Sequence, residues 1–299
     1  MIHNQKRAGF SMLELVFVIV ILGIISSLAS EIIARVYQSY IVQRASNRSS
    51  IKTEIAAMQI ANRLSHSIPN TVIGRVSDIN GTYRSIENLD NANYSVLEWV
   101  GSDIDGFQGN SATGISGWSG FIDINSPSTT KDRFLTLGSN IQNANAYIQA
   151  LSTNLNTTGL DGTALFFPGT YNVNTIGYNG NISGISIVSG RASPTIFTLY
   201  PIDPAPRVIK EHYKLAWSAY AIVPTIQPNG LWTLNLHYDL QPWNGVDYNN
   251  GGQQSILLRN VSVFQFSGNE NSIRFKLCQQ EWINNSDRVT TCKEKAVIR

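Results

Sequence analysis

The sequence predicts an α+β protein in which one long N-terminal helix packs on a C-terminal antiparallel β-sheet domain with large loops. Residues 10–29 are apolar apart from a few small residues and one carboxylate. An amphipathic pattern with three- and four-residue steps follows to about residue 66. Beyond residue 71 the chain changes to short alternating runs separated by Asn, Gly and Pro clusters.

We therefore expect three parts in chain order. A short basic leader occupies residues 1–9, a long helix residues 10–67, and a β-rich globular domain residues 68–299. At about 1.5 Å per residue, residues 10–29 are long enough to cross the ~30 Å hydrocarbon core of a bilayer. This segment is the predicted transmembrane part of the helix.

Charge predicts how the chain sits in the membrane. Lys6 and Arg7 precede the apolar segment, and the next basic residue is Arg35. Short basic flanks stay in the cytoplasm. We expect a single-pass inner-membrane protein with a cytoplasmic N-terminus and a periplasmic C-terminal domain.

The second half of the predicted helix has one apolar face, with charged residues mostly between the apolar positions. Pro69 ends the helix, because proline disfavours a helical conformation in the residue before it. The whole rod would be ~85 Å long. Its apolar positions are Ile33, Val36, Tyr37, Tyr40, Ile41, Ile51, Ile55, Met58 and Leu64.

The sequence after the long helix predicts a series of strands and one further helix, from Asn140 to Leu151. The clearest pair of strands is the hairpin on either side of residues 267–271, whose two faces alternate. The predicted strands are Tyr94–Val100, Gly120–Ile124, Ala164–Phe167, Ile182–Val188, Thr195–Leu199, Tyr213–Val223, Leu231–Tyr238, Ser255–Phe266 and Ser272–Cys278.

Glu14 is unusual inside an apolar segment, because a charge at bilayer depth costs roughly 2.5–3.5 kcal/mol on insertion scales. A basic leader ends in Gly9, and Phe10 then precedes this carboxylate. From Lys6 to Ile25 the chain resembles the N-terminus of type IV pilins and pseudopilins.

The resemblance implies that a prepilin peptidase cleaves after Gly9 and that the new N-terminal Phe10 is methylated. It also implies that Glu14 supports assembly into a periplasmic or extracellular filament. Many members of the family have a proline about twenty residues into the mature chain, but Ser30-Glu31-Ile32 stands there in this sequence. The curvature of the helix is therefore left open.

Three other interpretations compete for the N-terminus. It could be an ordinary signal anchor, which has no need of Glu14. It could be a cleaved secretory signal peptide, with Leu15–Ile25 as the apolar region and Ser27-Leu28-Ala29 as the cleavage site. Glu14 and the helical pattern beyond that site disfavour this second interpretation. A lipoprotein is disfavoured because no cysteine lies near the N-terminus.

The two cysteines, Cys278 and Cys292, are close in sequence and have no competitor. In an oxidising periplasm we expect them to form a disulfide that closes a small loop, worth ~3 kcal/mol in the chain-entropy model. The alternative is two unrelated buried thiols. A zinc site is disfavoured, because four ligands are required and no nearby histidine completes the set.

Composition disfavours nucleic-acid binding and most kinds of catalysis. The formal net charge is +2, and loss of Lys6 and Arg7 with the leader would leave a neutral chain. None of the four histidines lies in a nucleophile or metal motif. Asp103-Ile104-Asp105-Gly106 has an acidic spacing found in calcium loops, but a solvated turn is the better interpretation. We expect no enzyme, metal or cofactor.

Asn80 is a candidate glycosylation site, because Asp78 precedes an Asn-Gly-Thr sequence by two residues.

The segment from Ile256 to Phe266 resembles, more loosely, the end of J-type pseudopilins and large minor pilins. The resemblance implies a non-enzymatic filament subunit of a type II secretion, type IV pilus or DNA-uptake machine. Its partners would be the prepilin peptidase, other pilin or pseudopilin subunits and an inner-membrane assembly platform. The alternative is a signal-anchored periplasmic binding module or adhesin that forms no filament.

Overall fold

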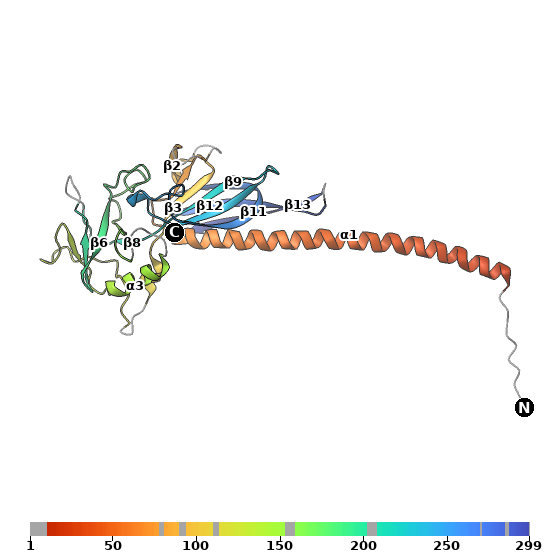
Figure 1. The fold of residues 1–299 in the computed structure, drawn as a ribbon, viewed down its shortest axis with the longest axis horizontal. Helices are drawn as coiled ribbons and strands as arrows, with labels where there is room; N and C mark the ends of the chain where they lie inside the picture. Colours follow the sequence, from red (N-terminus) through yellow and green to blue (C-terminus); the bar gives the residue numbers. More distant parts are fainter. Residues whose placement is uncertain are drawn as a thin grey trace, which may run out of the picture.

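Helix α1 (Met12–Ser65) dominates the computed structural model as a gently curved rod that extends far beyond the region of strands and loops (Figure 1). It is continuous over 54 residues, or ~81 Å. Only its C-terminal part packs on the sheet. The structure describes residues 11–77, 81–89, 94–109, 114–152, 159–201, 208–269, 271–284 and 287–298.

Eight strands form the sheet that holds α1, in the order β13-β12-β11-β10-β9-β3-β1-β2. All neighbours in this sheet are antiparallel, as predicted. The strands are β1 (Ile73–Arg75), β2 (Tyr83–Ser85), β3 (Val96–Val100), β9 (Ala219–Ile226), β10 (Trp232–Leu240), β11 (Gln253–Gly268), β12 (Ser272–Trp282) and β13 (Arg288–Ile298).

A long insertion between β3 and β9 forms the second part of the fold, at the far end from the helix tip (Figure 1). It contains a five-stranded sheet in the order β4-β7-β6-β5-β8. Its elements are α2 (Ile104–Gln108), β4 (Arg133–Leu135), α3 (Ile141–Leu151), β5 (Ala164–Phe166), β6 (Ile185–Ser193), β7 (Ile196–Leu199) and β8 (Lys214–Ala216). Short 3-10 turns occupy Ile86–Asn88 and Pro242–Asn244.

Strand β3 illustrates how the layers share their side chains. Leu97 and Trp99 belong to the core between α1 and the eight-stranded sheet. Val96 and Val100 point to the opposite face and pack against the insertion. Because successive side chains of a strand alternate between its faces, the sheet is covered on both sides here. A third core lies inside the insertion, around Trp118 and Phe134.

The α+β fold is confirmed, and several element boundaries differ from the prediction. The predicted strand Gly120–Ile124 is wrong, because only an isolated bridge from Phe121 to His212 forms there. The predicted strand Tyr213–Val223 is two strands, β8 and β9, which belong to different sheets. Strand β13 was not predicted, because its alternating Thr, Lys and Glu residues give no apolar run.

The predicted solvated turn at Asp103 is also wrong. Asp103 is buried and forms the N-cap of α2, where it accepts hydrogen bonds from the Gly106 N–H and the Trp118 indole N–H. Burial raises the pKa of this carboxyl to about 6. The carboxylate therefore has a structural role in starting a helix.

Candidate assembly site

The N-terminus of α1 begins with a capping box. Ser11 is the N-cap, and its Oγ accepts a hydrogen bond from the Glu14 N–H at 3.3 Å. The Ser11 N–H in turn donates to Glu14 Oε2 at 3.5 Å. Glu14 thus has a local partner, and it also places a negative charge in the first turn, where the helix dipole favours it.

No element among the described residues packs against the N-terminal half of α1. The helix is long and apolar enough to cross a membrane, with a mean hydropathy of 2.6 in its most apolar window. None of that window is buried. An exposed apolar helix of this length is costly in water, so it requires lipid or other helices around it.

An exposed apolar stripe continues along α1 to where the sheet covers the other side of the helix. Ile51, Ile55 and Met58 are all more than half exposed and lie three or four residues apart. The buried residues of the same turns, including Thr53 and Ala57, face the sheet. This stripe, Ile51, Ile55 and Met58, is called the outer stripe below. It is suited to contact a second helix.

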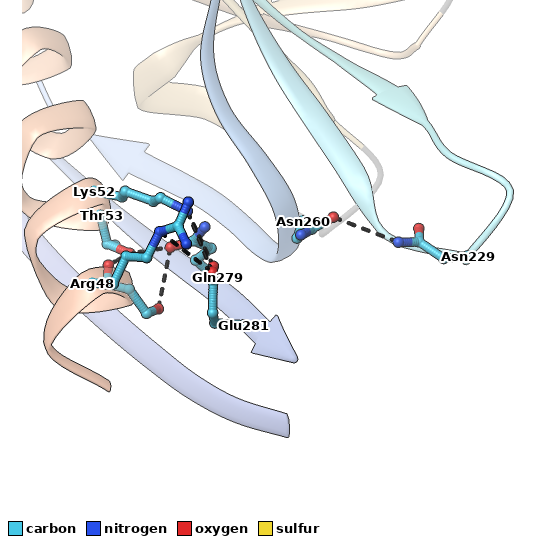
Figure 2. Close-up of polar contacts among 8 residues, drawn as sticks. Arg48, Lys52, Thr53, Asn229, Asn260, Gln279 and Glu281 are labelled. Carbon is cyan, nitrogen blue, oxygen red and sulfur yellow. Dashed lines mark hydrogen bonds and ion pairs between the residues drawn. The ribbon is translucent and has the colours of Figure 1, made fainter. Parts of the chain in front are cut away.

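A polar cluster anchors the first buried turns of α1 on strand β12 (Figure 2). Ser49 Oγ donates to Gln279 Oε1 at 3.1 Å, and Thr53 Oγ1 lies 3.3 Å from the same oxygen. The Thr53 hydroxyl also lies 2.7 Å from the Ser49 carbonyl. All three side chains are buried. We call Ser49, Thr53 and Gln279 the helix seat, because hydrogen bonds between buried groups tolerate only one axial position of the helix.

Ion pairs flank the helix seat on both sides. Lys52 and Arg48 lie 3.2 Å and 3.7 Å from the Glu281 carboxylate (Figure 2). On the other side Glu54 contacts Lys293 at 3.3 Å and Lys295 at 2.5 Å. Hydrogen bonds from Lys295 and Lys293 lower the pKa of the Glu54 carboxyl. Sequence reasoning missed the helix seat and these pairs, because their members lie more than 200 residues apart along the chain.

A separate cleft of about 520 Å³ lies in the seam between the eight-stranded sheet and the insertion. Arg75 and Glu98 form a buried ion pair in its wall. Burial raises the pKa of the Glu98 carboxyl, and the Arg75 guanidinium opposes that rise. Tyr178 Oη donates to the Thr71 carbonyl across the seam. The polar groups of this cleft bond to one another and to backbone, so they brace the two parts of the fold.

The other predicted site residues divide into two groups. Cys278 and Cys292 are joined in a disulfide between directly opposite residues of β12 and β13, as predicted. Gly9, Phe10 and the candidate glycosylation site Asn80 lie outside the described residues. Within the described part of the chain, no group of three or more His, Cys, Asp or Glu side chains could hold a metal ion.

Comparison with known proteins identifies the N-terminal segment. Residues 4–30 match the family described as the prokaryotic N-terminal methylation motif. No curated protein and no solved structure matches the chain. The match covers Gly9, Phe10 and Glu14 together with the whole apolar segment, residues 10–29. The chain therefore carries the N-terminal signature of type IV pilins and pseudopilins, the class of subunit that a prepilin peptidase processes and that assembles with other pilins.

Proposed function

We propose that this protein is a non-enzymatic, pilin-like filament subunit that assembles through α1. The observation that carries the proposal is the methylation motif, which continues into an apolar helix that no described part of the chain covers. In this role the leader, residues 1–9, is removed, residues 10–29 span the inner membrane, and the strands lie in the periplasm. An assembly platform then moves the subunit out of the bilayer into a filament.

The length of the insertion favours a minor subunit of the filament. The chain between β3 and β9 adds a whole five-stranded sheet at the far end of the molecule from the N-terminal tip of α1 (Figure 1). A repeating major subunit must accommodate this bulk at every position of the filament, whereas a minor subunit needs to do so only once. The machine is a type II secretion, type IV pilus or DNA-uptake system.

Mass spectrometry of the mature protein purified from membranes tests the proposal directly. We expect cleavage between Gly9 and Phe10, and a methyl group on the Phe10 amine. A Gly9→Val variant should keep its leader, because a larger side chain should hinder entry of the extended leader into the peptidase active site. An intact Met1 in the wild-type protein, or a new N-terminus near Ser30, would refute the filament role and favour an anchored binding module or a secreted one.

A further inference from the structure

Strand β13 ends the eight-stranded sheet with an unpaired edge, because its only neighbour in the sheet is β12. The two strands pair from Ser272↔Ile298 to Trp282↔Arg288 with no register shift. Within the described residues, no other element bonds to the backbone of β13. Natural strand edges are blocked by proline, a bulge, a covering element or charged side chains, lysine above all. Both lysines of β13, Lys293 and Lys295, are engaged by Glu54 of α1. Residues 288–298 contain no proline, and their pairing shows no bulge.

The disulfide shows which residues direct their backbone outward. Cys278 and Cys292 are direct partners with a Cα–Cα distance of 4.0 Å. That distance lies nearer to the ~4.5 Å of a non-hydrogen-bonded antiparallel pair than to the ~5.5 Å of a hydrogen-bonded pair. In a non-hydrogen-bonded pair both residues point their N–H and C=O away from each other. Ser262 on β11 donates to the Cys278 carbonyl, which agrees with this direction. Every second residue of β13 therefore offers its N–H and C=O outward: Arg288, Thr290, Cys292, Glu294, Ala296 and Ile298.

Charge around this edge favours an acidic partner. Strands β12 and β13 together carry five basic and two acidic residues. Glu54 of α1 adds a third negative charge beside them, so an excess of positive charge remains. The acidic residues are Glu281 and Glu294, and the basic residues are Arg274, Lys276, Arg288, Lys293 and Lys295.

A second copy of the chain fits the edge poorly. Strand β13 runs in the same direction as α1. Its early residue Val289 lies opposite Glu281, which pairs with Arg48 of α1. Its later residue Lys295 contacts Glu54, which lies further along α1. Antiparallel pairing of two β13 strands would point the two apolar helix halves in opposite directions. This exclusion rests on the proposed filament role. Parallel in-register pairing would instead place Glu294 beside Glu294, and like charges side by side are destabilising.

We infer that the outer edge of β13 is a docking site for an extended, carboxylate-bearing segment of another protein, which adds a ninth strand to the sheet. Main-chain hydrogen bonds to the outward-directed groups supply the affinity. The surrounding lysine and arginine side chains select a segment with acidic residues. The exposed Ile298 offers an apolar contact at one end of the strand.

Amide hydrogen exchange in the full-length protein in detergent micelles tests the edge itself. In the free protein the amides of Thr290 and Glu294 should exchange faster than those of Val289 and Thr291, which point to β12. A peptide of about ten residues with alternating glutamate and valine should slow the exchange of the outward amides. Protection of these amides in the free protein would overturn the inference, because the edge would already be occupied.

Matched variants test whether the outward N–H groups bind. Thr290→Pro removes one outward donor and leaves the β12 ladder intact, because proline is tolerated at an edge where its nitrogen faces solvent. It should weaken binding of the acidic peptide by about tenfold or more, whereas Thr290→Ala should not. Equal binding by both variants would overturn the docking site.

Two further outcomes decide the identity of the partner. A peptide with lysine in place of glutamate should bind about tenfold more weakly or worse, and equal binding would refute the acidic segment. A concentration-dependent dimer of the wild-type protein that Thr290→Pro abolishes would assign the edge to a second copy instead. Neither measurement depends on cleavage at Gly9, so a failure here is distinguishable from a failure of the filament role.

Discussion

Glu14 has two partners to satisfy in the proposed role, one inside the chain and one in a neighbour. The capping box gives it the Ser11 N–H, at a long 3.5 Å. The proposed cleavage after Gly9 would create a cationic amine on Phe10, close to the same depth of the membrane. In a filament, the amine of an incoming subunit can pair with the Glu14 carboxylate of its neighbour, which offsets the desolvation of both charges and fixes one stagger between them.

Glu14→Gln removes the negative charge but keeps the capping box, because glutamine can also occupy this position of the box. We expect normal cleavage and membrane insertion, and an incorporation into sheared filaments that falls about tenfold or more. Glu14→Leu should behave alike while improving the segment as an ordinary anchor. Incorporation of both variants at the wild-type level would show that the carboxylate has no assembly role. Loss of insertion would mean that the segment is only an anchor.

Asp239 predicts a pH dependence of stability. Its side chain is buried, and its Oδ2 has no hydrogen-bond partner among the described residues. Burial raises the pKa of this carboxyl from 3.8 to about 6. The folded state then binds more protons than the unfolded state between these two values, so the Asp239 contribution to stability falls as the pH rises from about 4 to about 6.

Asp239→Asn should remove that fall while preserving the backbone, since asparagine tolerates the positive φ of 58° at this position. Urea unfolding at pH 4 and pH 7 measures the effect. The variant should gain stability relative to the wild type at pH 7 and gain little at pH 4. An equal gain at both pH values would mean that Asp239 is not buried as a charge.

At the level of elements, the helix seat predicts non-additive mutations. Gln279→Leu leaves the buried Ser49 hydroxyl without its acceptor, which should cost about 1–3 kcal/mol in the free energy of unfolding. The combined variant Ser49→Ala, Thr53→Val, Gln279→Leu has no orphaned side-chain group and should recover most of that loss. Denaturant unfolding of the two variants provides the comparison. A triple variant less stable than the single one would show that the hydrogen bonds themselves supply net stability.

The disulfide should stabilise the pairing of β13 with the rest of the sheet. Replacing Cys278 and Cys292 by serine should lower the free energy of unfolding by about 3 kcal/mol, for a loop with a sequence separation of 14. Amide exchange should accelerate first along β13, which pairs with β12 alone among the described strands. Reduction of the wild-type protein is the matched control, and it should produce the same change.

The sequence predicts elements best where one local pattern determines them. Helix α3 was predicted from Asn140 and is found at Ile141–Leu151, and the β11–β12 hairpin turns where its Ser, Gly and Asn residues indicated. Strand β13 lacks such a pattern. The side chains on its inner face are covered by α1, and one of their partners there is the charged residue Glu54, so this face includes lysines as well as apolar residues. The helix seat was beyond sequence reasoning, because the partner of Ser49 is chosen by the tertiary fold.

For the whole molecule, the outer stripe separates folding from assembly. Ile55 is exposed in the isolated chain, so Ile55→Lys should change the free energy of unfolding by less than about 0.5 kcal/mol. In a filament the same side chain faces other helices, and burial of an unpaired charge there should greatly reduce incorporation. Ile55→Leu is the control, since it keeps an exposed apolar side chain at the same position of α1. Equal incorporation of the two variants in sheared filaments would exclude the stripe from the interface.

The position of the helix seat has a mechanical consequence. From Met12 to Ser49 the rod projects about 56 Å beyond its first buried residue, and it acts as a lever. A sideways force at its tip produces a torque that is largest at the rim of the sheet, where Ser49, Thr53 and Gln279 lie between two groups of ion pairs. An axial pull instead loads the same bonds in shear. The buried polar contacts that hold α1 on β12 therefore lie where extraction from a membrane would strain the molecule most.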